Sequence, residues 1–110
     1  MKTAIVLNHD GMGHGDRELG LKILAVFLRK SPAIREVHAV ILYNSGVKLA
    51  VTGSPVLAEL HQLHENGVEI LPCGTCLDQF GLREQLAVGE VSNMDAIVAE
   101  LNTVEKVITL

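Results

Sequence analysis

The sequence predicts an α/β fold, a three-layer α/β/α sandwich around a mostly parallel sheet of about five strands. Short apolar runs rich in β-branched residues alternate with longer amphipathic segments, which is the pattern of βαβ units. Hydrophobic residues make up 48% of the 110 residues but aromatic ones only 3%, so the core must be aliphatic, as suits a buried parallel sheet. This length fits one compact domain, and we expect a single domain over residues 1–110.

The first half of the chain is expected to hold two strands with a helix between them. Residues 3–8 form a continuous apolar run and predict a buried strand. After a glycine-rich loop, Asp16 stands where a helix N-cap belongs, and the Ser31-Pro32 pair ends that helix because Pro disfavours a helical residue before it. Residues 36–44 predict the second strand.

The second half repeats this alternation. A helix is marked by Ser54 as its cap and Gly67 beyond its end, and residues 68–71 predict a third strand that runs directly into a C-x-x-C turn. A short helix follows the turn. Ser92 is predicted to cap the final helix. Residues 106–110 are predicted to form the last strand.

The loops that follow the strands should lie close together in space. Crossover connections in a parallel sheet are right-handed, so every strand-to-helix loop reaches the same edge, where ligands of open α/β sheets bind. The loops that begin near positions 9, 45 and 73 therefore become predicted neighbours.

Both cysteines of the chain, Cys73 and Cys76, lie in that third loop. The pair is compatible with a metal clip, a redox dithiol, a sulfur carrier or two packed small residues. A thiol between a strand and a helix N-terminus faces unpaired backbone N–H groups, which favour the reactive thiolate. Gly74 permits a sharp turn, and Cys76 is near enough to resolve a mixed disulfide, so the context favours an exposed nucleophile at Cys73.

A metal site is less well supported. Structural zinc sites use four ligands, and there is no second C-x-x-C. His9 and His14 flank the glycine-rich loop at the same predicted edge and are the alternative metal ligands, whereas His38 lies inside a strand and is expected to be a structural histidine. The glycine-rich loop lacks the third glycine of a dinucleotide fingerprint, so we expect it to shape the edge or bind an anion.

Two charged residues bear on the thiols. Lys48 could bring a cation to the cysteine edge, or it could be an ordinary solvated lysine. Asp78 could cap the short helix but would oppose thiolate formation.

Composition excludes several partner classes. The net charge of −4 argues against a nucleic-acid-binding protein, and no apolar run approaches the roughly 20 residues that span a bilayer. The first apolar run lacks a signal-peptide cleavage site and is predicted to be a strand. We therefore expect a cytoplasmic protein with reduced thiols, no membrane partner and no cofactor.

Five segments resemble the DsrE/DsrF-like family. They are, in chain order, GDRELG, YNSGVKLA, GSPVLAEL, GVEILPCGTCLDQFGL and VGEVSNM. The resemblance covers nearly the whole chain and is greatest to the DsrE-like C-terminal domain of YedF-type proteins, a group linked to selenium metabolism. It implies a small α/β/α sandwich that assembles into dimers, trimers or hexamers. The better-understood members relay sulfur between proteins as a cysteine persulfide.

The resemblance and the loop positions together define an expected site. Cys73 and Cys76 match the cysteines of the family's CGTC motif and are the expected catalytic residues. The residues expected to support a bound ligand or anion lie in the three loops: Asn8, His9, Asn44, Ser45, Gly46, Lys48, Gly74 and Thr75. His9 and His14 are not part of the family pattern, and no metal is expected unless these two ligate one.

The functional expectation is a small cytoplasmic sulfur-relay protein, or a selenium/sulfur-metabolism accessory protein, that forms homo-oligomers. It would be a carrier rather than a turnover enzyme, with Cys73 accepting sulfur and Cys76 resolving it. The TusA-like domain of YedF-type proteins is absent from these residues, so separate donor and acceptor proteins, such as a TusA-like protein, are expected. The alternatives are a metal- or small-ligand-binding oligomeric module without sulfur transfer, and a structural subunit with buried cysteines.

Overall fold

A computed structural model describes residues 2–110 of the chain. It alternates strands with α-helices and short 3-10 helices, which are labelled η. In chain order the elements are β1 (Thr3–Leu7), α1 (Arg17–Lys30), η1 (Ser31–Ala33), β2 (Val37–Leu42), η2 (Asn44–Ala50), α2 (Leu57–Glu65), β3 (Glu69–Pro72), α3 (Gly74–Gln79), η3 (Arg83–Gln85), α4 (Met94–Thr103) and β4 (Lys106–Thr109).

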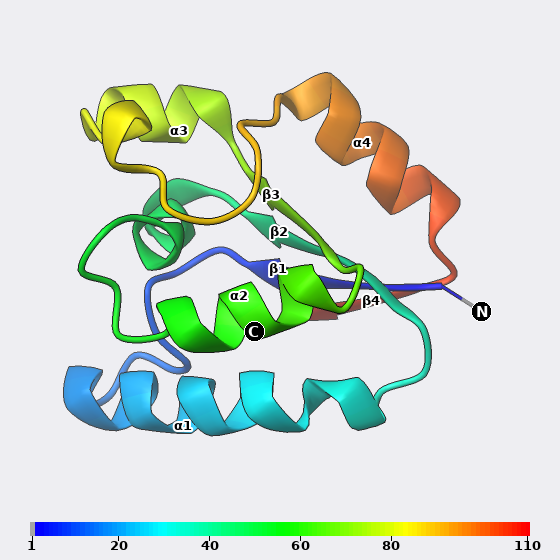
Figure 1. Cartoon of the computed structure of the whole chain (residues 1–110), viewed down its shortest axis with the longest axis horizontal. Helices are drawn as coiled ribbons and strands as arrows, with labels where there is room; N and C mark the ends of the chain where they lie inside the picture. Colours follow the sequence, from blue (N-terminus) through cyan, green and yellow to red (C-terminus); the bar gives the residue numbers. More distant parts are fainter. Residues whose placement is uncertain (1) are drawn as a thin grey trace.

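The strands form one parallel sheet in the order β3-β2-β1-β4. The chain steps outward from β1 to β3 with α1 and α2 on one face, then returns to β4 with α3 and α4 on the other (Figure 1). This change of face is what right-handed crossovers require when the direction across the sheet reverses. The predicted three-layer α/β/α architecture is confirmed.

The sheet has four strands rather than about five. A rudiment of a fifth lies along the outer edge of β3, where the N–H groups of Glu90 and Ser92 donate to the carbonyls of Ile70 and Pro72 at 3.3 and 2.8 Å. The pairing amounts to a single bridge between Cys73 and Ser92, because the chain turns into α4 immediately afterwards. The segment still covers the edge of β3.

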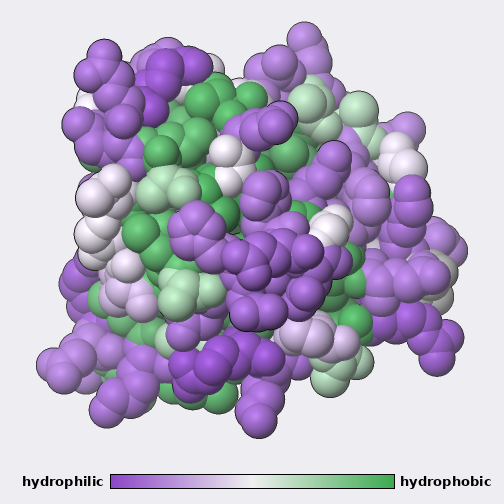
Figure 2. Space-filling view, in the orientation of Figure 1, coloured by the Kyte–Doolittle hydropathy of each residue, from purple (hydrophilic) through white to green (hydrophobic). Residues whose placement is uncertain are grey.

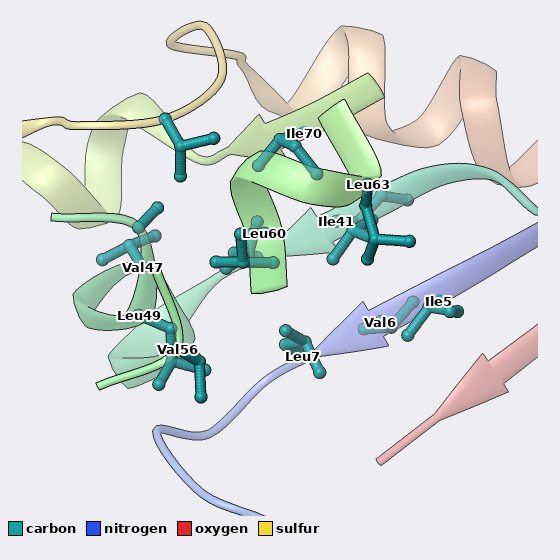
Figure 3. Close-up of a cluster of buried hydrophobic side chains, with 14 of the residues drawn as sticks. Ile5, Val6, Leu7, Ile41, Val47, Leu49, Val56, Leu60, Leu63 and Ile70 are labelled. Carbon is teal, nitrogen blue, oxygen red and sulfur yellow. The ribbon is translucent and has the colours of Figure 1, made fainter. Parts of the chain in front are cut away.

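The core is aliphatic, as expected. Fully buried side chains come from both faces of β1 and β2 and from the helices that cover them. Figure 3 shows part of this cluster, in which Leu60 and Leu63 of α2 pack against the sheet beside Ile41 and Ile70. Figure 2 shows mostly hydrophilic side chains across the middle of the viewed face, with hydrophobic ones reaching the surface between α2 and α3.

Two helix starts differ from the prediction. Asp16 does cap α1, accepting the N–H of Glu18 at 3.2 Å. Ser54, by contrast, binds the N–H of Val56 in a turn, and α2 begins only at Leu57. Asn93 rather than Ser92 caps α4, because the backbone of Ser92 is already bonded along β3. None of the helices in residues 2–110 has the length and apolar character needed to cross a membrane.

Candidate functional site

The carboxyl ends of β1, β2 and β3 bring the three predicted loops together. The N–H of Tyr43 donates to the carbonyl of Leu7 at 3.2 Å, and the N–H of Cys73 donates to that of Leu42 at 2.9 Å. Neighbouring strands therefore hold the loops side by side. The contact between the second and third loops continues to a thiol, since the N–H of Asn44 donates to Sγ of Cys76 at 3.1 Å.

Gly46 makes this close approach possible. A Cβ atom on Gly46 would lie 2.0 Å from the carbonyl oxygen of Leu7 and 3.4 Å from the amide nitrogen of His9. Any side chain would push the second loop away from the end of β1. The role of Gly46 is therefore to let the two backbones approach closely, because it has no side chain, and not to contact a ligand.

Cys73 is the N-cap residue of α3 and is only 2% exposed. The sequence prediction of an exposed nucleophile at this position is wrong for the isolated chain. The physical reason is the rudimentary edge strand, because Ser92 pairs with Cys73 and accepts the N–H of Gly74 at 2.8 Å. Cys73 thus belongs to the core rather than to the surface of the turn.

Cys76 is the accessible thiol. It is half-buried and lies in a hollow of about 210 Å³ whose lining residues are Asn44, Thr75, Cys76, Gln79 and Phe80. The backbone of Asn44 has φ of 52°, a left-handed conformation that Asn tolerates better than most residues. The same residue donates its N–H to Sγ of Cys76. Strained backbone conformations of this kind cluster at functional sites.

The surroundings of Cys76 favour the neutral thiol. Burial raises its pKa, the adjacent Cys73 thiol raises it further, and the Asn44 N–H acts in the opposite direction. The thiolate is therefore not the resting form of Cys76 at neutral pH. Activation requires either a bound partner or a rise in pH.

Charged groups are arranged around the hollow rather than inside it. Nζ of Lys48 lies 4.5 Å from the ring centroid of Phe80, a cation–π contact that places the ammonium beside a lining residue. Asp78 is bound in bidentate fashion by Arg83, with Nε–Oδ1 and Nη2–Oδ2 distances of 2.6 and 2.9 Å. Hydrogen bonding to Arg83 lowers the pKa of Asp78, so this carboxylate is ionised but compensated.

Arg83 is the functional-site neighbour that the sequence analysis missed. Besides Asp78, it reaches the carbonyl of Gly74 at 3.4 Å and so ties the end of α3 back to its beginning. An arginine five positions after an acidic residue gives no helical pairing signal, because the helix ends between them at Gln79. Only the turn that follows α3 brings the two side chains together.

The two loop histidines form a separate feature. The rings of His9 and His14 stack with centroids 4.2 Å apart and planes tilted by 31°, and both line a different hollow of about 180 Å³ that includes Arg17. Asp10 joins them, 3.4 Å from His9 and 2.8 Å from Arg17. Within residues 2–110, neither histidine belongs to a group of three potential metal ligands, and neither do the cysteines.

The expected supporting residues therefore divide into three groups. Asn44 and Thr75 line the hollow of Cys76, and Lys48 lies at its rim through Phe80. Gly46 and Gly74 allow close backbone packing. The remaining three expected residues, Asn8, His9 and Ser45, do not line this hollow.

The sequence pattern of one known family matches the whole chain. The description of that family is DsrE/DsrF-like, and the match covers residues 1–110. The chain belongs to the DsrE/DsrF-like family. This confirms the resemblance at the family level, while the YedF-type subclass stays a prediction.

Solved structures share the fold of this DsrE-like chain at low sequence identity. YchN from E. coli has 18% identity and a TM-score of 0.69, covering 100% of both chains. MTH1491 from Methanobacterium thermoautotrophicum has 19% identity and a TM-score of 0.73, covering 99% of this chain and 98% of its own. BT1422 from Bacteroides thetaiotaomicron has 20% identity and a TM-score of 0.66, covering 99% and 95%. None of the curated proteins compared with the chain matches it significantly.

Identities this low establish the fold of the DsrE-like chain and not its activity. The arrangement around Cys76 must therefore be interpreted from its own chemistry.

Proposed function

We propose that this DsrE-like chain is a cytoplasmic sulfur-relay protein that carries sulfur as a persulfide on Cys76. The observation that carries the proposal is the contrast between the two thiols. Cys76 opens into a hollow and accepts an N–H, whereas Cys73 is 2% exposed beneath it. This exchanges the roles that the sequence suggested for the two cysteines.

The transfer step is a thiol exchange without net oxidation. The thiolate of Cys76 attacks the outer sulfur of a donor persulfide, the S–S bond of the donor breaks, and the donor leaves as a thiolate that takes up a proton. The product is a persulfide on Cys76 and a free thiol on the donor. Transfer onward repeats the same exchange with an acceptor thiolate.

The raised pKa of Cys76 is compatible with a carrier. A thiol that is neutral when the chain is free reacts slowly with bulk oxidants. A donor or acceptor protein that brings a cation to the rim, beside Lys48, would favour the thiolate only within the complex.

A redox dithiol is the second candidate. The two thiols are near neighbours, since the Cys73 thiol raises the pKa of Cys76, and such a pair can form a disulfide when an oxidant is present. In that case Cys73 would displace the outer sulfur from a Cys76 persulfide as hydrosulfide. The two candidates give different masses, because a persulfide adds one sulfur atom and a disulfide removes two hydrogens.

The test is intact-mass spectrometry and peptide mapping after incubation of the reduced protein with glutathione persulfide. We expect the wild type and Cys73→Ala to gain sulfur on the peptide that contains residue 76, and Cys76→Ser to gain none. Cys73→Ala is the matched control because it keeps the accessible thiol and removes the buried one.

Sulfur on Cys73 in the Cys76→Ser protein would overturn the assignment. Loss of two hydrogens without sulfur gain in the wild type would favour the redox dithiol. Parallel incubation with a selenium analogue of the donor decides which cargo is preferred.

We also propose that the chain works as a homo-oligomer with separate donor and acceptor proteins, of which a TusA-like protein is one candidate. Large hydrophobic side chains are exposed along one face of α1, on α4 and on the outer strand: Leu19, Ile23, Val26, Met94, Val98 and Val107. On α1 their spacing of four and three residues forms a stripe opposite the buried Leu24 and Leu28.

Analytical ultracentrifugation tests the assembly. We expect a dimer, trimer or hexamer for the wild type and a smaller species for Ile23→Asp, because a charge in a hydrophobic interface is costly. Lys22→Asp on the neighbouring exposed position is the control and should leave the mass unchanged. Sedimentation of the wild type as a monomer at micromolar concentration contradicts the proposal.

A further inference from the structure

Three potential metal ligands converge at the end of the sheet opposite the cysteines. His38 is the second residue of β2, Glu69 begins β3, and Glu100 lies in the second half of α4. One ring nitrogen and one oxygen from each carboxylate all lie within 4.8 Å of one another. Figure 1 shows how the three elements meet, with α4 running along the sheet from the cysteine end toward the opposite end.

A β-bulge places His38 in this group. Thr3 pairs with Val37 and Ala4 pairs with Ala39, so His38 is an extra residue without a partner in β1. Such bulges redirect a side chain relative to the regular alternation of a strand. Here the imidazole Nδ1 lies 2.6 Å from Oε2 of Glu100 on α4.

The charges of the cluster are not balanced within the described chain. The Glu100 side chain is only 11% exposed, and its carboxylate pairs with the imidazole of His38. The carboxylate of Glu69 has no hydrogen-bond or ion-pair partner among residues 2–110, and no lysine or arginine in that part of the chain pairs with Glu100 either. Two carboxylates around one imidazole, one of them largely buried, form a site that a cation would stabilise.

We propose that His38, Glu69 and Glu100 bind a divalent transition-metal ion of the zinc class. One imidazole nitrogen and two carboxylate oxygens suit zinc, cobalt or nickel better than calcium, which prefers six or more oxygens. Tetrahedral zinc bonds of about 2.1 Å hold neighbouring ligand atoms roughly 3.4 Å apart. The exposed side chain of Glu69 would rotate inward from the present limit of 4.8 Å. Nδ1 of His38 and Oε2 of Glu100, now 2.6 Å apart, would separate slightly as the metal replaces the proton between them.

The geometry leaves room for an exchangeable ligand. Three protein ligands are one fewer than a closed structural zinc site uses, so water or a small anion completes the coordination. A hollow of about 150 Å³ adjoins Glu69, with His64, Ile70, Leu71 and Glu90 as its other lining residues. This site is distinct from the hollow of Cys76, which lies beyond the other end of β3.

The test uses the full chain, purified without an affinity tag, stripped with a chelator and kept reduced. We expect Co²⁺ to bind at one equivalent per chain with visible d–d absorption and without a thiolate charge-transfer band. Zn²⁺ should displace the cobalt and raise the melting temperature. Glu69→Gln and His38→Gln should each weaken binding at least about 10-fold.

Two controls separate this site from other ligands. His14→Gln and Cys76→Ser should bind cobalt like the wild type, because neither residue belongs to the cluster. Glu69→Gln changes an exposed side chain and should fold with an unchanged melting temperature in the absence of metal, so its loss of binding reports ligation. No saturable cobalt binding, wild-type affinity in Glu69→Gln, or loss of binding in Cys76→Ser would each overturn the proposal.

Discussion

Iodoacetamide is expected to alkylate Cys73 at least about 100-fold more slowly than Cys76 in the native protein, because a buried thiol must wait for local opening. Cys73 is 2% exposed and its neighbours Ser92 and Gly74 are hydrogen-bonded over it, whereas Cys76 already opens into a hollow. An opening free energy of about 3 kcal/mol is sufficient for this ratio.

Single-cysteine proteins make the comparison direct. Cys76→Ser reports the rate of Cys73, Cys73→Ala reports the rate of Cys76, and full denaturation should bring the two rates close together. Similar native rates would show that the edge segment opens readily, and the sequence-based role of Cys73 as the nucleophile would return.

The same experiment has a defined pH dependence. Because burial and the Cys73 thiol raise the pKa of Cys76, its alkylation rate should still be rising at a pH where an ordinary thiol has levelled off. Cys73→Ala removes one cause and should move this profile to lower pH. The stability that comes from the neutral thiol is present below the pKa of the unfolded chain and is lost as pH rises through the folded value.

Gly46→Ala is expected to destabilise the protein by about 3 kcal/mol, since overpacking against backbone is relieved only by moving the main chain. The added Cβ would lie 2.0 Å from the carbonyl oxygen of Leu7, which cannot rotate away as a side chain would. The second loop would then separate from the end of β1 and carry the Asn44 N–H away from Cys76.

Chemical denaturation and the Cys76 alkylation rate measure both effects together. Gly15→Ala is the matched control, because nothing lies within 4 Å of the position of its Cβ. The control should change stability by no more than about 0.5 kcal/mol. Equal stability of the two variants would show that the approach of the loop to β1 is not required.

The strands illustrate what local sequence can decide. Buried parallel strands are continuous apolar runs, so residues 3–8 and 36–44 were sufficient to locate β1 and β2 within two residues. For a sheet expected to have about five strands, the sequence located four segments and no fifth. The rudimentary pairing along β3 depends on where residues 90–92 lie in space, which no local pattern encodes. The prediction that Ser92 caps α4 is wrong for the same reason, because the position of Ser92 beside β3 is set by packing.

The site shows the same division. Alternating strands and helices fixed the edge at which the three loops meet, because crossover handedness leaves no other arrangement. The sequence ranked Cys73 above Cys76 as the exposed nucleophile, because Cys73 stands at the start of the helix after the turn. Its burial depends on Ser92, a distant residue that pairs with it only in the folded chain.

The sequence by itself determined the α/β layers, the aliphatic core, the position of the cysteine turn and the family of this protein. The tertiary structure alone decided which thiol reaches solvent, which charge neutralises Asp78, and that a bulge aims His38 at Glu100 beside Glu69. The physical reason is the distance along the chain over which each effect acts. Apolar periodicity and turn chemistry act over a few residues, whereas burial, ion pairing and ligand convergence depend on segments that meet only after the chain has packed.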